Sequence, residues 1–213
     1  MTIGIGVTSY KRPKHLELFI KQINKHTKSF ILYVAKDIPS VSQAKNECIN
    51  ALKDCDHIFL FDDDCFPIAD GWADYFINSG LDHSCYMTSH PLYKNNIFSL
   101  YNDANGVFMH ITKEVVNQVG YFNTKYDRYG YEHAAYSHRI NRAGLSKGRF
   151  ICLNDANKYL WSLDLQGVGE FDIEHKSSVC ETLVKELYVK NKAEYVRETT
   201  SNQIKYEYTP NTI

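Results

Sequence analysis

The segment HIFLFDDD, residues 57–64, decides the fold. Residues 58–61 are a continuous apolar run, which is typical of a β-strand buried on both faces within a parallel sheet. Three carboxylates, Asp62, Asp63 and Asp64, follow this run directly. Ligands of such sheets bind beyond the carboxyl ends of the strands, so the same segment predicts where a functional site lies.

The segments on both sides of this strand alternate between strand and helix patterns. Upstream, we predict strands at 3–7 and 30–35 and helices at 12–26 and 40–52. Downstream, we predict helices at 70–79, 112–120, 131–142 and 177–196 and strands at 85–89, 106–111 and 150–153. Alternating strands and helices form right-handed crossovers. The predicted fold class is therefore α/β, with a mostly parallel central sheet flanked by helices.

Composition limits the class of protein. The chain has 213 residues, with 24 Lys and Arg against 25 Asp and Glu, which gives a net charge of −1. This balance argues against a nucleic-acid partner, since such proteins show a basic excess. No apolar run reaches the roughly 18 residues of a membrane span, and the N-terminus lacks the pattern of a signal peptide. The six cysteines are scattered, as in reduced proteins, so we expect a cytoplasmic location.

The domain organisation is expected to be simple. Residues 1–196 predict a single domain, and residues 197–213 predict a polar tail or linker. The chain could therefore be one module of a longer, multi-domain protein.

The acidic triplet suggests metal chemistry. Three adjacent carboxylates repel one another, and a cation or solvent must offset this repulsion. Magnesium-like ions are commonly held by one or two carboxylates together with substrate phosphates. A solvated acidic turn is the alternative interpretation, and the position after a buried strand favours the metal.

Four segments resemble a known family in the right order: IGIGVTSYKRP (3–13), VSQAKNECINAL (41–52), HIFLFDDDCFP (57–67) and VGYFNTKYDRYGYEHAAYSHRINRAG (119–144). They are similar to the nucleotide-sugar-binding half of GT-A-fold glycosyltransferases of the family-2 type. These enzymes carry a D-x-D motif after a hydrophobic strand and a G-x-E-D motif further on. The resemblance covers residues 2–176 and implies a GT-A (Rossmann-like) fold.

The resemblance also implies roles for individual residues. The nucleotide would be bordered by Thr8, Ser9, Tyr10, Arg12, Asp62 and Asp63. Asp37 would read the uracil edge, and Lys45 would sit near the diphosphate. The implied metal ligands are Asp62, Asp64 and the late histidine His175. A histidine beside carboxylates favours Mn²⁺ over Mg²⁺.

The sequence departs from the family pattern at one position. The second acid of G-x-E-D, a general base in inverting members, is replaced by His133 after Glu132. Either Glu132 or His133 would place the acceptor hydroxyl, and we favour transfer with retention of configuration. Arg139 lies two turns further along the predicted helix, where it could orient Glu132.

The expected function is metal-dependent transfer of a sugar from a nucleoside-diphosphate sugar, a UDP-sugar, to a glycan or protein-linked glycan. A nucleotidyltransferase and a non-catalytic nucleotide-sugar binding module are the alternatives. The length of the chain and its polar tail also resemble those of the N-terminal domain of capsid-glycan glycosyltransferases from large DNA viruses.

Overall fold

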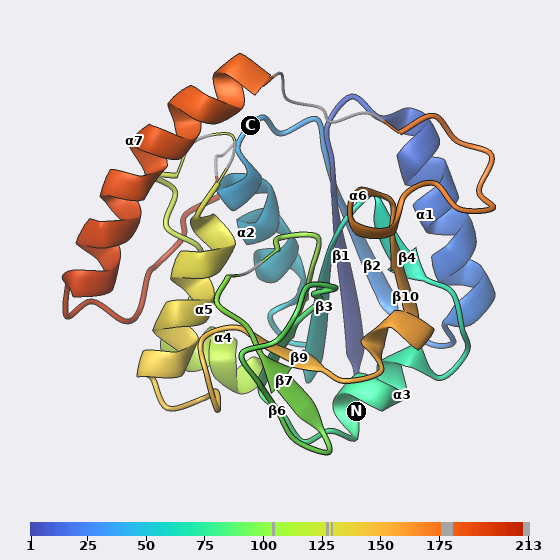
Figure 1. Cartoon of the computed structure of the whole chain (residues 1–213), viewed down its shortest axis with the longest axis horizontal. Coiled ribbons are helices and arrows are strands. Elements are labelled where there is room, and N and C mark those ends of the chain that lie inside the picture. Colours follow the sequence, from blue (N-terminus) through green and yellow to red (C-terminus); the bar gives the residue numbers. More distant parts are fainter. Residues whose placement is uncertain (104, 127, 129, 176–180, 211–213) are drawn as a thin grey trace.

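The computed structural model describes residues 1–103, 105–126, 128, 130–175 and 181–210. An eight-stranded sheet in the order β2-β1-β3-β8-β5-β9-β7-β6 forms the centre of the molecule (Figure 1). Its strands are β1 (Ile3–Ser9), β2 (Ile31–Lys36), β3 (His57–Asp62), β5 (His83–Cys85), β6 (Tyr93–Lys94), β7 (Phe98–Leu100), β8 (Phe108–Thr112) and β9 (Ile151–Leu153). A second, two-stranded sheet joins β4 (Cys65–Pro67) to β10 (Leu160–Ser162).

Helices flank the sheet (Figure 1). They are α1 (Pro13–His26), α2 (Val41–Leu52), α3 (Trp72–Ile77), α4 (Lys113–Val119), α5 (Glu132–Arg142), α6 (Leu163–Gln166) and α7 (Glu181–Thr200), with a 3₁₀ turn at Ala156–Lys158. Six of the eight central strands run in one direction, because only β7 and β8 are reversed. The predicted α/β class, with a central sheet flanked by helices, is confirmed. The sheet is mixed, since three of its strand pairings are parallel and four are antiparallel.

Strand β3 is buried on both faces, as its apolar run predicted. Phe59 and Phe61 pack in one hydrophobic cluster with residues of α1 and α3. Ile58 and Leu60 pack in the other cluster with residues of α2. The period-two alternation of side chains thus supplies two cores from one strand.

The glycines of β1 explain how closely α2 approaches the sheet. A Cβ atom added at Gly6 would lie 2.6 Å from the Cβ of Cys48 on α2. Real Cβ atoms do not approach so closely, so α2 packs directly on the backbone of β1. Ser40 caps this helix by accepting the backbone N–H of Gln43 at 3.3 Å.

Some predicted bounds differ from the structure. The strand expected at 85–89 lies at His83–Cys85, and the helix expected at 177–196 is α7, which extends to Thr200. Residues 176–180 lie outside the described part. The paired strands β4, β6, β7 and β10 were missed because segments of two or three residues carry no detectable periodicity.

Residues 197–210, expected as part of a polar tail or linker, lie against the body of the protein. Arg139 on α5 is fully buried and donates from Nε to Glu198 Oε1 at 2.6 Å. Its other nitrogens donate to the backbone carbonyl oxygens of Val119, Tyr121 and Ile204 at 3.0, 2.7 and 3.1 Å. Arg139 therefore anchors the C-terminal segment, and the expectation that it orients Glu132 is wrong.

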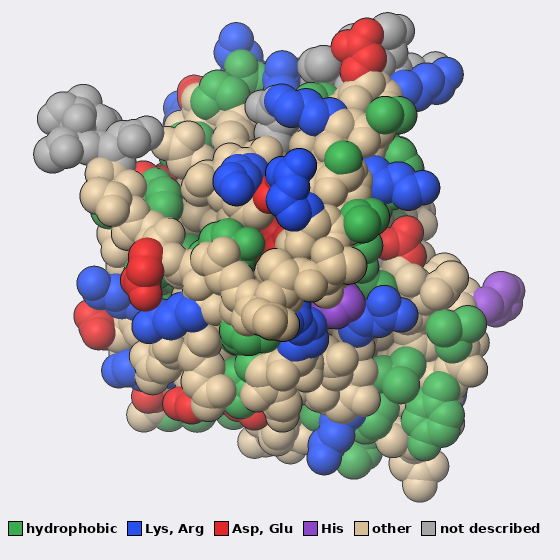
Figure 2. Space-filling view, turned by 90° about the vertical axis from the view of Figure 1, so that its left-hand side faces the viewer, with side chains coloured by type: hydrophobic (Ala, Val, Ile, Leu, Met, Phe, Trp, Pro, Cys, Tyr) green, Lys and Arg blue, Asp and Glu red, His purple; other side chains and the backbone are tan. Residues whose placement is uncertain are grey.

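The face that carries α7 shows acidic, basic and hydrophobic side chains interspersed, without one dominant basic patch (Figure 2). Exposed hydrophobic side chains on α7 include Tyr188, Val189 and Val196. Among the described helices, none combines the length and apolar character needed to cross a membrane.

Two fully buried histidines, His83 and His110, predict sensitivity to acid. Burial lowers the pKa of His83 to about 4 and the pKa of His110 well below its usual value. As the pH falls below 6.5, the usual pKa of histidine, the unfolded chain takes up protons that the folded chain does not. The two histidines therefore leave the free energy of unfolding unchanged above that pH, and they lower it progressively as the pH falls towards 4. For His83 alone the loss is about 2 kcal/mol at pH 5.

Chemical denaturation at about pH 7.5 and about pH 5 checks this prediction. The control is His110→Phe, because the His110 ring already stacks on Phe59 with centroids 4.8 Å apart. The variant should lose less stability than the wild type over this interval. Acidic groups act equally in both proteins, so an identical pH dependence would contradict the prediction.

Candidate active site

The three aspartates follow β3 beside the carboxyl end of β1. The parallel register places Thr8 opposite Asp62. The hydroxyl of Thr8 donates to Asp62 Oδ1 at 2.8 Å, and the hydroxyl of Ser9 donates to Asp63 Oδ2 at 2.5 Å. Four predicted site residues thus meet at one edge of the sheet.

Arg12, at the start of α1, binds the carboxylates of Asp63 and Asp64. Its Nη2 donates to Asp63 and to Asp64 Oδ2, the latter at 2.8 Å. Burial raises the pKa of Asp63 to about 6 and the pKa of Asp64 to about 7, although Arg12 opposes both shifts. Two buried carboxylates thus share one guanidinium, and further positive charge would favour their ionised forms.

Lys45 on α2 is fully enclosed and forms an ion pair with Asp62 Oδ1 at 2.6 Å. Burial by itself would raise the pKa of Asp62, but Lys45, followed by His133, outweighs burial and lowers it. Asp63 is also fully enclosed. Its contacts with Ser9 and Arg12 hold the loop after β1. Asp63 was expected to border the nucleotide, and its enclosed side chain does not support that role.

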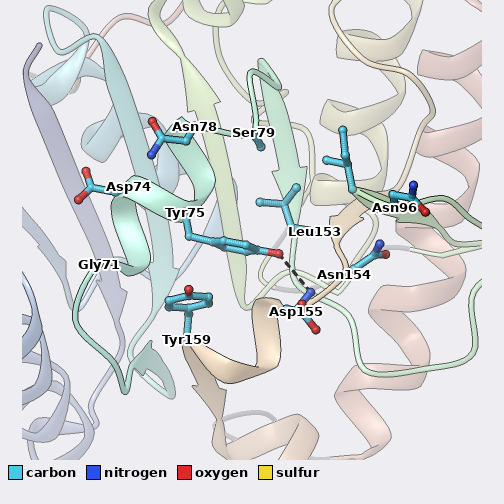
Figure 3. Close-up of a pocket in the computed structure, with 11 residues that line it drawn as sticks. Gly71, Asp74, Tyr75, Asn78, Ser79, Asn96, Leu153, Asn154, Asp155 and Tyr159 are labelled. Carbon is cyan, nitrogen blue, oxygen red and sulfur yellow. Dashed lines mark hydrogen bonds between the residues drawn. The ribbon is translucent and has the colours of Figure 1, made fainter.

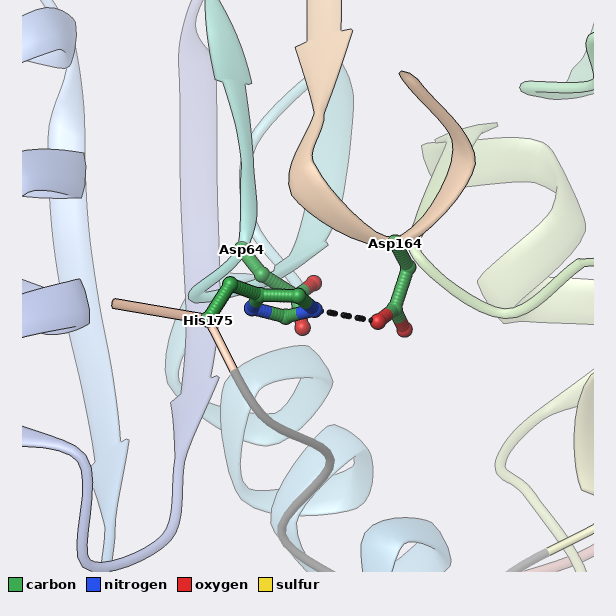
Figure 4. A group of neighbouring side chains, drawn as sticks. All are labelled: Asp64, Asp164 and His175. Carbon is green, nitrogen blue, oxygen red and sulfur yellow. Dashed lines mark hydrogen bonds and ion pairs between the residues drawn. The ribbon is translucent and has the colours of Figure 1, made fainter. Parts of the chain in front are cut away.

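A cluster of three potential metal ligands lies next to this network. One ligand atom each from Asp64, Asp164 and His175 lies within 4.8 Å of the others (Figure 4). His175 Nε2 lies 2.5 Å from Asp164 Oδ1. Asp64 Oδ1 is buried and has no hydrogen-bond partner in the described part of the chain. Two carboxylates and one imidazole are a donor set that suits Mn²⁺ or Mg²⁺.

This cluster differs from the predicted ligand set. Asp64 and His175 come together as expected, but Asp62 is not a member of the group, because it pairs with Lys45 and Thr8. Asp164 was missed. It is brought near Asp64 by the pairing of β4 with β10, and the backbone N–H of Leu163 donates to Asp64 O at 2.8 Å. Only the long-range pairing of two three-residue strands could have identified it.

His15 on α1 contacts the histidine of this cluster. Its Nε2 lies 3.2 Å from His175 Nδ1. Burial, together with the positive charge of Arg12, lowers the pKa of His15 to about 4. The first turn of α1 therefore reaches the aspartates through Arg12 and the histidine through His15.

A cavity of about 450 Å³ opens beside Asp62 and Asp164. Glu132 and His133, the predicted catalytic pair, line it from the start of α5. His133 Nδ1 lies 3.0 Å from Glu132 Oε1. Among the described residues, neither His133 Nε2 nor Glu132 Oε2 has a hydrogen-bond partner. Both atoms are themselves enclosed, so they are unpaired but not exposed to the cavity.

Gly106 makes room for the His133 ring. A Cβ atom at this position would lie 2.4 Å from His133 Nδ1. The backbone before α5 is also unusual, since Tyr131 adopts φ +71°. A left-handed residue is costly outside glycine and is often found at functional sites.

The two remaining predicted nucleotide-binding residues lie on the adjoining loops. Asp37, exposed after β2, accepts the backbone N–H of Lys11 at 2.8 Å. The Tyr10 ring stacks against the guanidinium of Arg128 at 4.5 Å. Asp37 therefore fixes the turn before α1, and Arg128 is a neighbour of the site that the sequence did not reveal.

Solved structures define the class of fold. GalNAc-T7 solved with UDP, GalNAc and Mn²⁺ matches with a TM-score of 0.62 and 11% identity, over 92% of this chain and 48% of that chain. S. aureus TarS 1-349 matches with a TM-score of 0.55 and 9% identity, over 76% of this chain and 60% of that chain. The catalytic domain of Drosophila β1,4-galactosyltransferase 7 matches with a TM-score of 0.51 and 14% identity, over 87% of this chain and 79% of that chain. The chain has the GT-A fold, as the sequence resemblance implied.

In sequence, the chain is similar to the uncharacterised glycosyltransferase R363 of Acanthamoeba polyphaga mimivirus. The two are 32% identical over 143 residues, which cover 60% of this chain and 55% of the relative. The chain thus spans about half the length of the curated relative it matches. No protein-family model matches the sequence.

Proposed function

We propose that the chain is a metal-dependent glycosyltransferase that moves a sugar from a UDP-sugar to a glycan or protein-linked glycan. The observation that carries this proposal is the cluster of Asp64, Asp164 and His175 between the Arg12 network and the cavity of Glu132 and His133. The fold supports it, since GalNAc-T7 was solved with UDP and Mn²⁺ and TarS with UDP.

On the donor side, Mn²⁺ (or Mg²⁺) would be held by Asp64, Asp164 and His175. When bound, the ion would offset the charge of the diphosphate and assist its departure. The hydroxyl of Thr8 and the ammonium group of Lys45 fix Asp62, whose carboxylate lines the cavity where the nucleotide sugar would enter. Tyr10 and Asp37 would border the nucleoside.

On the acceptor side, Glu132 and His133 would orient the attacking hydroxyl. The Nε2 atom of His133 would accept its hydrogen bond, and because this atom is enclosed the ring would have to turn towards the cavity. We favour retention of configuration because a histidine stands where inverting relatives carry the second acid. The coupling constant of the new anomeric proton, measured by NMR on the product, tests this choice, and an inverted product would overturn it.

A calorimetric titration with UDP, run with Mn²⁺ and again with EDTA, tests the donor site. We expect binding that requires the metal. Binding that is equally tight in EDTA would contradict the metal-dependent mechanism. A nucleotidyltransferase would instead release diphosphate from a nucleoside triphosphate, and a binding module would bind UDP-sugars without turnover, so product analysis separates the three functions.

His15→Ala should weaken Mn²⁺ binding about 10–100-fold, since a residue that orients a metal-bound histidine typically contributes that much. Calorimetry with Mn²⁺ alone measures the effect. His26→Ala is the matched control, because His26 lies at the other end of α1, paired with Asp70 at 2.8 Å. Unchanged affinity in His15→Ala, with normal binding by the wild type, would exclude this positioning role.

Two further proposals concern the acceptor and the location of the protein in the cell. The mimivirus relative supports a viral glycan as acceptor, and screening glycans released from virions tests that idea. All five cysteines in the described part of the chain are free and buried, which supports a cytoplasmic location. Cell fractionation would test the location.

A further inference from the structure

A second cavity, of about 530 Å³, lies apart from the candidate active site. It opens between α3, the turn that joins β6 to β7, and the segment after β9 (Figure 3). It shares no lining residue with the cavity of Glu132 and His133. Helix α3 begins near the amino end of β1, where Trp72 Nε1 donates to Thr27 Oγ1 at 2.9 Å. Asp62, Asp63 and Asp64 of the candidate active site lie at the carboxyl end of β3, which runs parallel to β1, and so at the opposite edge of the sheet.

Two stacked tyrosines line this cavity. The rings of Tyr75 and Tyr159 stack with centroids 4.5 Å apart and an interplanar angle of 18°. Both are half-buried, and the Tyr75 hydroxyl accepts the backbone N–H of Asp155 at 3.1 Å (Figure 3). The rings are therefore fixed before any ligand arrives. A rigid aromatic face packs well against the C–H face of a sugar ring.

Amide side chains from separate elements surround the tyrosines (Figure 3). Asn78 comes from the end of α3 and Asn96 from the β6–β7 turn, and both are exposed. A primary amide donates and accepts hydrogen bonds at once, which matches neighbouring hydroxyl groups of a saccharide. Asn154 is already held, because it accepts from Ser99 Oγ at 2.7 Å and donates to the carbonyl of Asn95 at 2.6 Å. It shapes the wall of the cavity, and Asn78 and Asn96 are the other two amides that line it.

The charges of the lining narrow the chemistry of the ligand. The described lining residues include Asp74 and Asp155 but no Lys or Arg. An anionic ligand such as a nucleotide would therefore be repelled. Asp155 is paired with Lys158 at 3.2 Å, which weakens the attraction for a cation. A neutral ligand rich in hydroxyl groups fits best.

We propose that this cavity is a second carbohydrate-binding site, which takes a neutral saccharide unit against the stacked pair of Tyr75 and Tyr159, with Asn78 and Asn96 as hydrogen-bonding partners. If the chain transfers sugar to an extended glycan, the site would hold a remote part of that acceptor. Attachment at two points raises the effective concentration of the acceptor end at the active site without any new catalytic contact.

The test is an NMR titration of the ¹⁵N-labelled full chain with xylobiose, diacetylchitobiose and mannobiose, without metal or nucleotide. We expect at least one disaccharide to shift the backbone amides of residues 74–79, 96–97 and 153–159. Because no donor is present, the outcome is independent of the transferase activity. Shifts confined to residues 130–134, or no shifts with any disaccharide, would overturn the proposal.

Two variants and one control sharpen the test. Tyr159→Ala should weaken binding about tenfold or more, and Asn96→Ala, at an exposed turn where folding is not at risk, should weaken it less. The control is Tyr93→Ala, which removes a 53% exposed ring outside the cavity and should leave affinity unchanged. If spermidine shifts these amides and none of the disaccharides does, the cavity binds cations and the saccharide proposal is excluded.

Discussion

Replacing Asp64 with Ala should abolish metal-dependent UDP binding and lower sugar transfer about 10³-fold or more, because a bound ion contributes several kcal/mol to departure of the leaving group. Asp64 is the one member of the aspartate triplet that also belongs to the cluster with Asp164 and His175. Its Oδ1 is buried and without a partner in the described residues. No neighbouring carboxylate of the triplet could take over, since Asp62 and Asp63 are held by Lys45 and Arg12.

The same substitution should leave the fold intact. Burial raises the pKa of Asp64 to about 7, so its ionised form is disfavoured where it stands, and Arg12 keeps Asp63 as its partner when Asp64 is replaced. Calorimetry with UDP and Mn²⁺, combined with a thermal melt, measures both effects. Asp54→Ala, at an exposed position before β3, is the matched control. Retained metal-dependent binding in Asp64→Ala would mean that the ion, if used, is held elsewhere.

Replacing Arg139 with Met should destabilise the protein by about 3–5 kcal/mol, the usual cost of removing one partner of a buried ion pair. The variant leaves the carboxylate of Glu198, which is 2% exposed, without its cation. It also leaves the carbonyl oxygens of Val119, Tyr121 and Ile204 without their donor. Urea denaturation gives the free energy of unfolding of each variant.

Two comparisons show whether the loss arises from the ion pair. Arg142→Met, in the last turn of the same helix and only half-buried, should cost far less. The double variant Arg139→Met with Glu198→Leu should recover part of the loss, because it removes both buried charges together. A cost below about 1 kcal/mol for Arg139→Met would show that the C-terminal segment is anchored by other contacts.

The first half of the fold was predictable because its signals are local. The apolar run before Asp62 and the alternating strand and helix patterns over residues 3–52 can each be recognised within a few consecutive residues. Asp164 and Glu198 were not predictable, because their roles depend on pairings with residues 100 and 59 positions away. Asp62 was expected to bind metal because the D-x-D pattern does not reveal that a buried lysine already neutralises it.

The proposed metal ligands come from segments that are far apart in the chain, at positions 64, 164 and 175. An ion shared among them would act as a removable cross-link that closes a loop of about a hundred residues. Ions that bind only the folded state add stability in proportion to the logarithm of their concentration, about 2.7 kcal/mol at a hundredfold excess over the dissociation constant. The melting temperature would then report the occupancy of the site, so candidate metals can be ranked before a donor sugar or an acceptor is known.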